Sequence, residues 1–189
     1  MENDNYEGNY EGNYEGNHDG NYEGHINRGD EAMKQHNFDE AWECFQAALE
    51  CNKTSAYALN KLGVILCRRG EFEEAITYFT KALENDPMLA AACNNMGNAH
   101  LELKRYDEAR VYYEKALALN PDYASAHHNL GVVYRRQGKY LKAVPEIKKG
   151  QRLEERQQRQ NMTPREKMIG LIGVAIILAI VVVILLLIR

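Results

Sequence analysis

A regular recurrence of residue types at every 34th position constrains this chain more than any other feature of its sequence. Three kinds of residue recur at this interval, namely a glycine (Gly29, Gly63, Gly97, Gly131), an aromatic residue (Phe38, Phe72, Tyr106, Tyr140) and an alanine (Ala41, Ala75, Ala109, Ala143). Because glycine makes up only 14 of the 189 residues, a period shared by three columns indicates four copies of one structural unit. We therefore expect a repeat architecture in which each copy packs on the next.

Each copy contains two stretches with helical patterning. In the third copy, residues 90–103 form the first stretch and residues 107–119 form the second, and Lys104-Arg105 makes the short link between them. Apolar residues in the second stretch are spaced by three and four positions, which predicts one buried stripe on a helix. We expect the two helices to run antiparallel, with Gly97 facing Ala109 and Ala116 and with aromatic residues filling the gaps around them.

The third copy resembles the tetratricopeptide repeat (TPR) family. The matching segments are Asn95-Met96-Gly97-Asn98-Ala99 and Tyr106-Asp107-Glu108-Ala109. The resemblance covers four units, at residues 22–55, 56–89, 90–123 and 124–157. It implies an all-α solenoid of helix-turn-helix repeats in a right-handed superhelix, a role in protein binding, no cofactor and no catalytic centre.

The resemblance also implies a concave groove lined by the first helix of each unit. The side chains that this groove would present are Asn60, Lys61, Arg68, Asn94, Asn95, Asn98, Glu102, His128, Asn129, Arg135 and Arg136. Amides in such a row can hydrogen-bond to the backbone of an extended peptide, and arginines can pair with its acidic side chains. The alternative is that these residues are only solvated or structural positions of the repeat.

The fourth unit departs from the family pattern inside its second helix. Pro145 lies in the helical stretch and Gly150 replaces the expected alanine. An interior proline removes a backbone hydrogen bond and costs about 3 kcal/mol. We therefore predict a kinked or frayed last helix that leads through residues 154–160 toward the C-terminal segment.

Residues 168–188 contain no polar side chain, and all but five of them are Leu, Ile or Val. As a helix this segment is about 31 Å long, which matches the hydrocarbon core of a bilayer. Residues 158–167 form a basic linker before it, and only Arg189 follows it. This charge asymmetry predicts a single transmembrane helix with the repeats in the cytoplasm, in a bacterial inner membrane or as a tail anchor in an organelle membrane.

The N-terminal residues 1–21 consist largely of Asn-Tyr-Glu-Gly tetrads. Glycine at every fourth position opposes a helix, and few apolar groups are available to bury, so we expect a disordered acidic tail. A sharper hypothesis is that its tyrosine and glutamate side chains dock into a basic groove of the repeats, in the same chain or in a neighbouring one.

The remaining features argue against other classes of protein. The net charge of −4 disfavours a nucleic-acid binder. The cysteines form no C-x-x-C pair and the histidines show no metal-ligand spacing, so we expect neither a metal site nor enzyme activity. The sequence thus predicts a membrane-anchored interaction adaptor with a protein or peptide partner. Two alternatives stay open, a self-assembling structural coat of homo-oligomers and a tail-anchored organelle factor.

Overall fold

The computed structural model describes residues 20–165 together with Met168, Ile180 and Ile184. The chain divides into two units after Gln151, and each is described by itself. Within the described residues all regular structure is helical, in the order α1 (Gly20–Lys34), α2 (Phe38–Cys51), α3 (Ala56–Arg69), α4 (Phe72–Asn85), α5 (Ala90–Glu102), α6 (Tyr106–Leu119), α7 (Ala124–Arg136) and α8 (Tyr140–Asn161).

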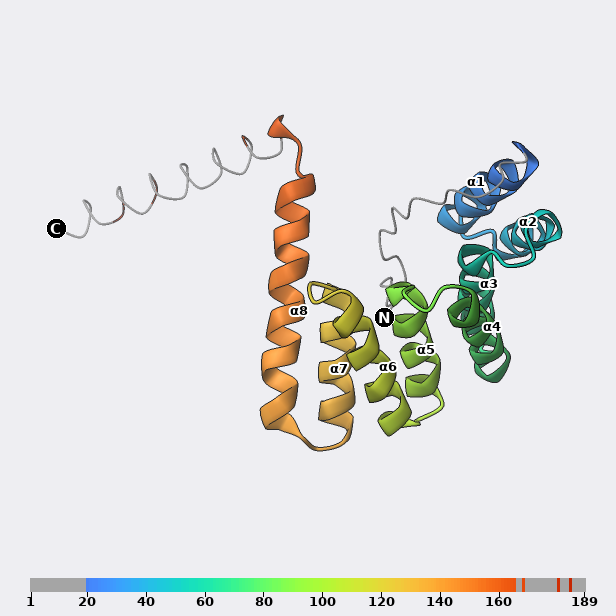
Figure 1. The fold of residues 1–189 in the computed structure, drawn as a ribbon. Helices are drawn as coiled ribbons and strands as arrows, with labels where there is room; N and C mark the ends of the chain where they lie inside the picture. Colours follow the sequence, from blue (N-terminus) through green and yellow to red (C-terminus); the bar gives the residue numbers. More distant parts are fainter. Residues whose placement is uncertain (1–19, 166–167, 169–179, 181–183, 185–189) are drawn as a thin grey trace. The chain divides into compact units, whose positions relative to one another are not determined.

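The first unit is a stack of helix pairs (Figure 1). Helices α1 and α2, α3 and α4, and α5 and α6 pack as pairs, and each second helix then packs on the first helix of the next pair. First helices also touch one another, α3 with α5 and α5 with α7. Because contacts join only neighbouring pairs, the expected all-α solenoid is confirmed.

The turn between the two helices of every pair has the same backbone conformation. Four residues at equivalent positions of the repeat adopt a positive φ there, namely His36 (57°), Gly70 (81°), Lys104 (59°) and Gly138 (72°). Only two of them are glycine, the residue that adopts this left-handed conformation without a steric cost. The short links are therefore tight turns that return the chain antiparallel to itself.

The glycine column lets each first helix lie against a large side chain of its partner. A Cβ atom added to Gly97 would lie 2.6 Å from Cε1 of Tyr113, and Gly29 and Gly63 lie similarly close to Phe45 and Phe79. These three rings are fully buried. The atoms nearest to that Cβ all belong to the Tyr113 ring, so an aromatic residue fills the gap beside Gly97 as expected.

Helix α8 is continuous over Tyr140–Asn161 with Pro145 inside it, so the predicted fraying of this helix was wrong. Pro145 is the sixth residue of the helix, where the missing N–H leaves only the carbonyl of Leu141 without its helical donor. Leu141 is 95% exposed, so water can reach that carbonyl. Gly150 has a role in packing, since a Cβ there would lie 2.8 Å from the carbonyl oxygen of Ala124.

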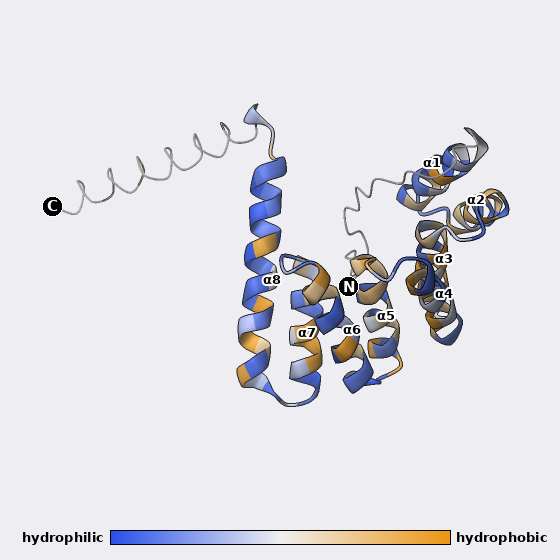
Figure 2. Ribbon diagram, viewed as in Figure 1, coloured by the Kyte–Doolittle hydropathy of each residue, from blue (hydrophilic) through white to orange (hydrophobic). Residues whose placement is uncertain are grey.

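Figure 2 shows apolar residues in the first turns of α8 and hydrophilic residues over most of its remaining length. Among the residues that the structure describes, no helix combines the length and the apolar character needed to cross a bilayer. The predicted transmembrane segment at 168–188 lies outside the described residues, apart from Met168, Ile180 and Ile184. The predicted tail at 1–21 lies outside them as well, apart from Gly20 and Asn21.

Candidate binding surface on the first helices

The residues predicted to line a groove all lie on α3, α5 and α7, and they fall into two groups. Four asparagines are buried, with 6% of Asn60, 1% of Asn94, 2% of Asn95 and 7% of Asn98 exposed. The charged residues Arg68, Glu102, Arg135 and Arg136 are exposed near the ends of the same helices. Lys61, His128 and Asn129 are half-buried between these groups. We call this whole set the first-helix surface.

The asparagines of the first-helix surface bond to one another across repeat boundaries. The Asn95 side chain donates from Nδ2 to Oδ1 of Asn60 at 3.0 Å. Asn129 donates in the same way to Oδ1 of Asn98 at 2.9 Å and to Oδ1 of Asn94 at 3.4 Å. Since a buried amide without a partner costs about 1–3 kcal/mol, these bonds hold successive first helices in register.

One column of the repeat supplies the donor at every boundary. Its members are Asn27, Lys61, Asn95 and Asn129, one from each unit. At the first boundary Lys61 replaces the amide, and its Nζ lies 3.0 Å from Oδ1 of Asp30 as an ion pair without hydrogen-bond geometry. Tyr57 donates to the other oxygen of Asp30 at 2.6 Å. Each member after the first thus reaches back to the preceding unit.

We call these side-chain bonds between successive first helices the asparagine ladder. Two of its acceptor oxygens differ in the number of hydrogen bonds that they accept. Oδ1 of Asn98 accepts both from Asn129 and from the hydroxyl of Tyr113 at 2.7 Å. Oδ1 of Asn95 is buried and has no partner among the described residues. Because this oxygen lies below the surface that a ligand could contact, its unpaired state is a cost to stability and not a binding feature.

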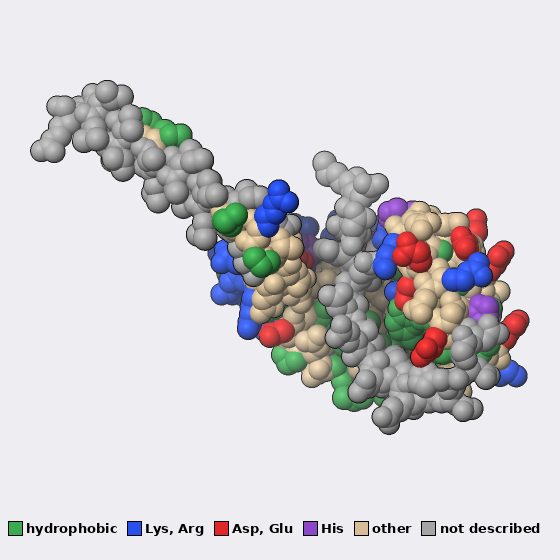
Figure 3. Space-filling model, turned by 90° about the horizontal axis from the view of Figure 1, so that it is seen from above, with side chains coloured by type: hydrophobic (Ala, Val, Ile, Leu, Met, Phe, Trp, Pro, Cys, Tyr) green, Lys and Arg blue, Asp and Glu red, His purple; other side chains and the backbone are tan. Residues whose placement is uncertain are grey.

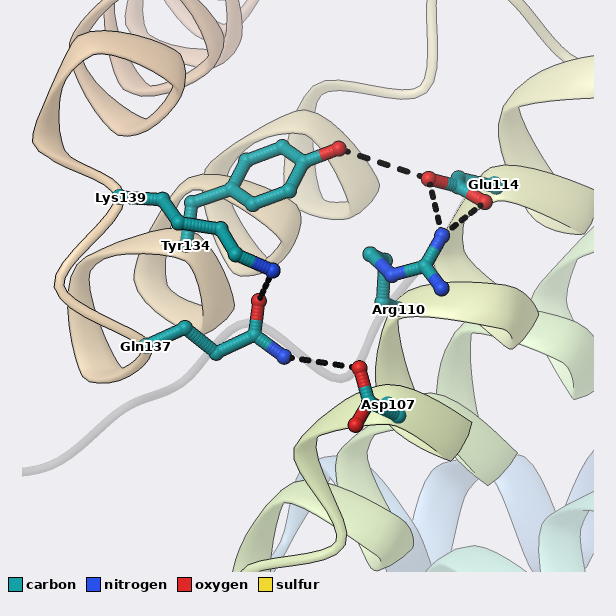
Figure 4. A network of polar contacts seen from close by, with 6 residues as sticks. All are labelled: Asp107, Arg110, Glu114, Tyr134, Gln137 and Lys139. Carbon is teal, nitrogen blue, oxygen red and sulfur yellow. Dashed lines mark hydrogen bonds and ion pairs between the residues drawn. The ribbon is translucent and has the colours of Figure 1, made fainter.

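A second series of bonds joins the repeats near the start of each second helix. Asp39 accepts from Arg69 at 2.7 Å, Glu73 accepts from Arg105 at 3.0 Å, and Asp107 accepts from Gln137 at 3.1 Å. Figure 4 shows the last of these, where Lys139 also donates to Gln137 and Arg110 donates to both oxygens of Glu114. The three acids occupy one column of the repeat, and its fourth member is Leu141.

The buried thiols of the repeats are packing residues rather than reactive groups. Cys44, Cys67 and Cys93 are buried and Cys51 is exposed, and all four are free. Burial raises the pKa of Cys67 to about 12 and also raises the pKa of Cys93. Burial is also the main cause that lowers the pKa of His100, whose ring stacks on Tyr112 with centroids 5.3 Å apart. Within the described part of the chain, no group of three or more His, Cys, Asp and Glu side chains is arranged to hold a metal ion.

His127 fastens the last helix to the stack. Its Nδ1 lies 2.6 Å from Oε2 of Glu146 on α8, and its Nε2 lies 3.0 Å from the carbonyl oxygen of Pro121. Sequence reasoning did not identify this contact, nor the parts that Asp30 and Tyr113 play in the ladder. The period of the sequence marks which columns recur, but it does not show which columns meet across a boundary.

Family comparisons identify the class of these repeats. Four models, described as tetratricopeptide repeat or TPR repeat, match residues 26–88, 66–111, 97–138 and 124–157. Their matches run together from residue 26 to residue 157, so this part of the chain consists of tetratricopeptide repeats. No curated protein matches the chain significantly.

Among solved structures, a crystal structure of MamA is similar at 25% identity with a TM-score of 0.64, covering 75% of this chain and 83% of that one. PilF of Pseudomonas aeruginosa is similar at 29% identity with a TM-score of 0.67, covering 72% of this chain. The match spans 63% of the PilF chain, which is less than two thirds of its length.

Proposed function

We propose that this chain is an interaction scaffold that binds an extended protein segment along the first-helix surface. The observation that carries the proposal is the asparagine ladder across α3, α5 and α7, which is buried and holds together helices that expose Arg68, Glu102, Arg135 and Arg136. Because the ladder fixes these first helices in register, a peptide that lies across them meets exposed side chains on a backbone that needs no reordering.

The exposed charges beside the ladder give such a surface its selectivity. Arg68, Arg135 and Arg136 are exposed, and Glu102 lies between them along the stack. The Arg68 guanidinium also lies over the ring of Phe38, 6.0 Å from its centroid, which restricts its motion. We expect this arrangement to favour a ligand with acidic side chains that can pair with the arginines.

We further propose that residues 168–188 tether the scaffold to a membrane with the repeats in the cytoplasm. The support is the sequence of that segment, which has no polar side chain, and the excess of basic residues before it. A tether raises the concentration of the binding surface near other membrane proteins without any added contact. The repeat fold, a protein-interaction fold, also supports our expectation that the chain is not an enzyme.

A comparison of the peptide affinities of two triple variants tests the binding surface. Peptides selected from a displayed random library against the full chain in lipid nanodiscs are used as probes, and their Kd values are measured by fluorescence anisotropy. Replacing Arg68, Arg135 and Arg136 with alanine is expected to weaken binding by about tenfold or more. The matched control replaces the exposed cations Lys81, Lys104 and Lys115, which lie on α4, in the turn between α5 and α6, and on α6. Equal Kd values in both triple variants would remove the first-helix surface from the proposal.

The tether has a separate test. The full chain made in the presence of lipid vesicles is expected to float with them in a density gradient and to resist extraction at high pH. A chain that lacks residues 168–188 is expected to stay at the bottom of the gradient. A full chain that remains with the soluble fraction would contradict the tether and leave the binding surface unaffected.

A further inference from the structure

The last pair of helices ends the stack with an uncovered apolar patch. Tyr140 is 64% exposed, Leu141 is 95% exposed and Val144 is 51% exposed, all within the first five residues of α8. In the first and second units the equivalents of Val144 are Trp42 and Ile76, which pack against the core of the following unit, whereas the third unit has Arg110 at this position. The patch is therefore the surface on which a fifth unit would lie.

Four lysines lie within five residues of this patch along the chain, of which Lys139 donates to Gln137 at 2.9 Å and Lys142 lies over the ring of Tyr134 at 5.8 Å. Lys139, Lys142, Lys148 and Lys149 are all exposed, and Lys148 follows Leu141 and Val144 at helical spacings of seven and four. The single acid of this stretch, Glu146, is turned toward His127 at 2.6 Å. Figure 3 shows several Lys and Arg side chains along the part of the molecule where α8 lies. The patch thus combines exposed apolar side chains with a rim of one sign of charge.

Contact with a second copy does not suit this surface. Two patches that face each other across a two-fold axis bring eight lysines together, which is unfavourable. Head-to-tail stacking places the patch against the outer face of α1, where the equivalents of the buried residues Ala58, Leu62 and Ile65 are Gly24, Arg28 and Glu31. An exposed ion pair of Arg28 with Glu40 lies beside this face. The apolar side chains of the patch would remove water from the charged groups on this face without offering them hydrogen bonds in return.

We infer that the patch of Tyr140, Leu141 and Val144 with its rim of lysines lies on an anionic lipid surface. The inference rests on the proposed tether, because it concerns the membrane that holds residues 168–188. Six residues separate the end of α8 from that segment, enough chain for about 20 Å of reach, so α8 can lie along the bilayer. Apolar side chains enter the headgroup boundary while lysines pair with lipid phosphates, as in other interfacial helices.

The contact sets the direction in which the scaffold faces its partners. A chain held only by its last segment can turn relative to the bilayer, whereas a chain also held at the start of α8 cannot. The first-helix surface then keeps one orientation to the membrane. Anionic lipid content and salt control this orientation, since the attraction of lysines to the surface decays within a Debye length.

Fluorescence quenching of the reconstituted full chain tests the inference. The native indole is removed by Trp42→Phe and a reporter is introduced by Leu141→Trp, with circular dichroism to confirm folding. In vesicles of brominated lipids with roughly 30% anionic headgroups, we expect a blue shift and strong quenching of this reporter, both lost in zwitterionic vesicles or at high salt. The control carries Val111→Trp, because Val111 is an exposed residue of α6, and we expect no quenching there.

Two further measurements complete the test, one on a charge-reversed variant and one on the wild-type chain. Replacing the four lysines with glutamate in the Leu141→Trp chain is expected to lower quenching by about tenfold. In the wild-type chain, anionic vesicles are expected to slow tryptic cleavage after Lys142 and Lys148 relative to cleavage after Lys81. Flotation of every variant with vesicles measures whether residues 168–188 still hold the chain on the membrane, independently of the contact at α8.

Three results would overturn the inference while flotation is intact. The first is an unquenched reporter in anionic vesicles, together with unchanged tryptic cleavage. The second is a blue shift in zwitterionic vesicles that grows with protein density, which would identify a second copy as the occupant. The third is a blue shift that requires an added acidic protein.

Discussion

At the scale of single residues, the repeat depends on positions where one atom decides the packing. The glycine column and the aromatic residues that fill the gaps around it were expected from the sequence, but the close approach of one ring to each glycine was not, because the period alone does not give distances. In the structure an aromatic ring covers each of Gly29, Gly63 and Gly97, and Ile147 covers Gly131. The fourth unit therefore keeps the glycine with a smaller, non-aromatic partner.

Gly97→Ala is expected to destabilise the chain by about 1–3 kcal/mol, because the added methyl group overlaps a buried ring. The Cβ would lie 2.6 Å from Cε1 of Tyr113, which is fully buried. The control is Gly24→Ala in α1, where the methyl group meets nothing within 4 Å. That change is expected to stabilise by about 0.5–1 kcal/mol, since alanine favours the helix. Urea unfolding measures both, and equal effects would contradict the packing argument.

The turn column predicts two substitutions with effects of opposite sign. Lys104 has a φ of 59° and Gly70 has a φ of 81° in equivalent turns. Lys104→Gly is expected to raise the free energy of unfolding by about 0.5–1 kcal/mol, since the left-handed conformation is strained for lysine. Gly70→Ala is expected to lower it by about 1–2 kcal/mol for the same reason. Thermal melts of the two variants check the signs, and a stabilising Gly70→Ala would refute the argument.

Burial of Cys67 predicts both its reactivity and a loss of stability at high pH. Burial raises the pKa of this thiol from 9.0 to about 12, so the folded chain keeps a proton that the unfolded chain releases. The stability from this group is therefore present below pH 9.0 and is lost as the pH rises toward about 12. At pH 8 about one thiol in ten thousand is ionised, so iodoacetamide should modify the exposed Cys51 first and Cys67 only after unfolding. Peptide mapping measures the order, and fast labelling of Cys67 in folded protein would contradict it.

At the scale of helices, the features that the sequence did not predict are mostly side-chain contacts across the boundaries between repeats. The helix pairs follow from apolar spacing and from the short links, both of which are local signals. The asparagine ladder is not local, because its bonds join residues 31 to 35 positions apart. The predicted row of Asn60, Asn94, Asn95 and Asn98 lies on one surface, yet these side chains are buried and bonded to neighbouring repeats.

Asn129→Ala is expected to cost about 1–3 kcal/mol, because it leaves the buried amides of Asn94 and Asn98 without this donor. The matched control is Asn27→Ala, which changes the same column in the first unit. Asn27 is exposed and no described unit precedes it. We expect a change within about 0.5 kcal/mol for the control. Chemical unfolding measures the difference, and equal losses would show that the ladder does not couple the repeats.

At the scale of the whole solenoid, burial is concentrated in the middle of the stack. Residues 62–67 of α3 and residues 92–100 of α5 are all buried, whereas α1 and α8 are the first and last of the described helices. In a one-dimensional array, stability is a sum of unit and boundary contributions, so units with one boundary open first.

Hydrogen exchange is therefore expected to be slowest in α3–α6 and faster in α1, α2 and the start of α8. Mass spectrometry of peptides from the full chain measures the gradient. Asn129→Ala should raise exchange in α7 and α8 more than in α1 and α2, because it weakens only the last boundary. Uniform exchange along the stack would instead indicate a single cooperative unit.

The leucine in the column of linking acids has a consequence for how such an array can lengthen. Duplicating the third unit within the chain would place Asp107 and its copy each before a unit that can supply a side-chain donor. An internal copy would therefore form these linking hydrogen bonds at both of its boundaries. A copy appended after the fourth unit would meet Leu141 in place of an acid. Gene duplication or engineering can thus enlarge this protein from within, while its last unit stays a terminus.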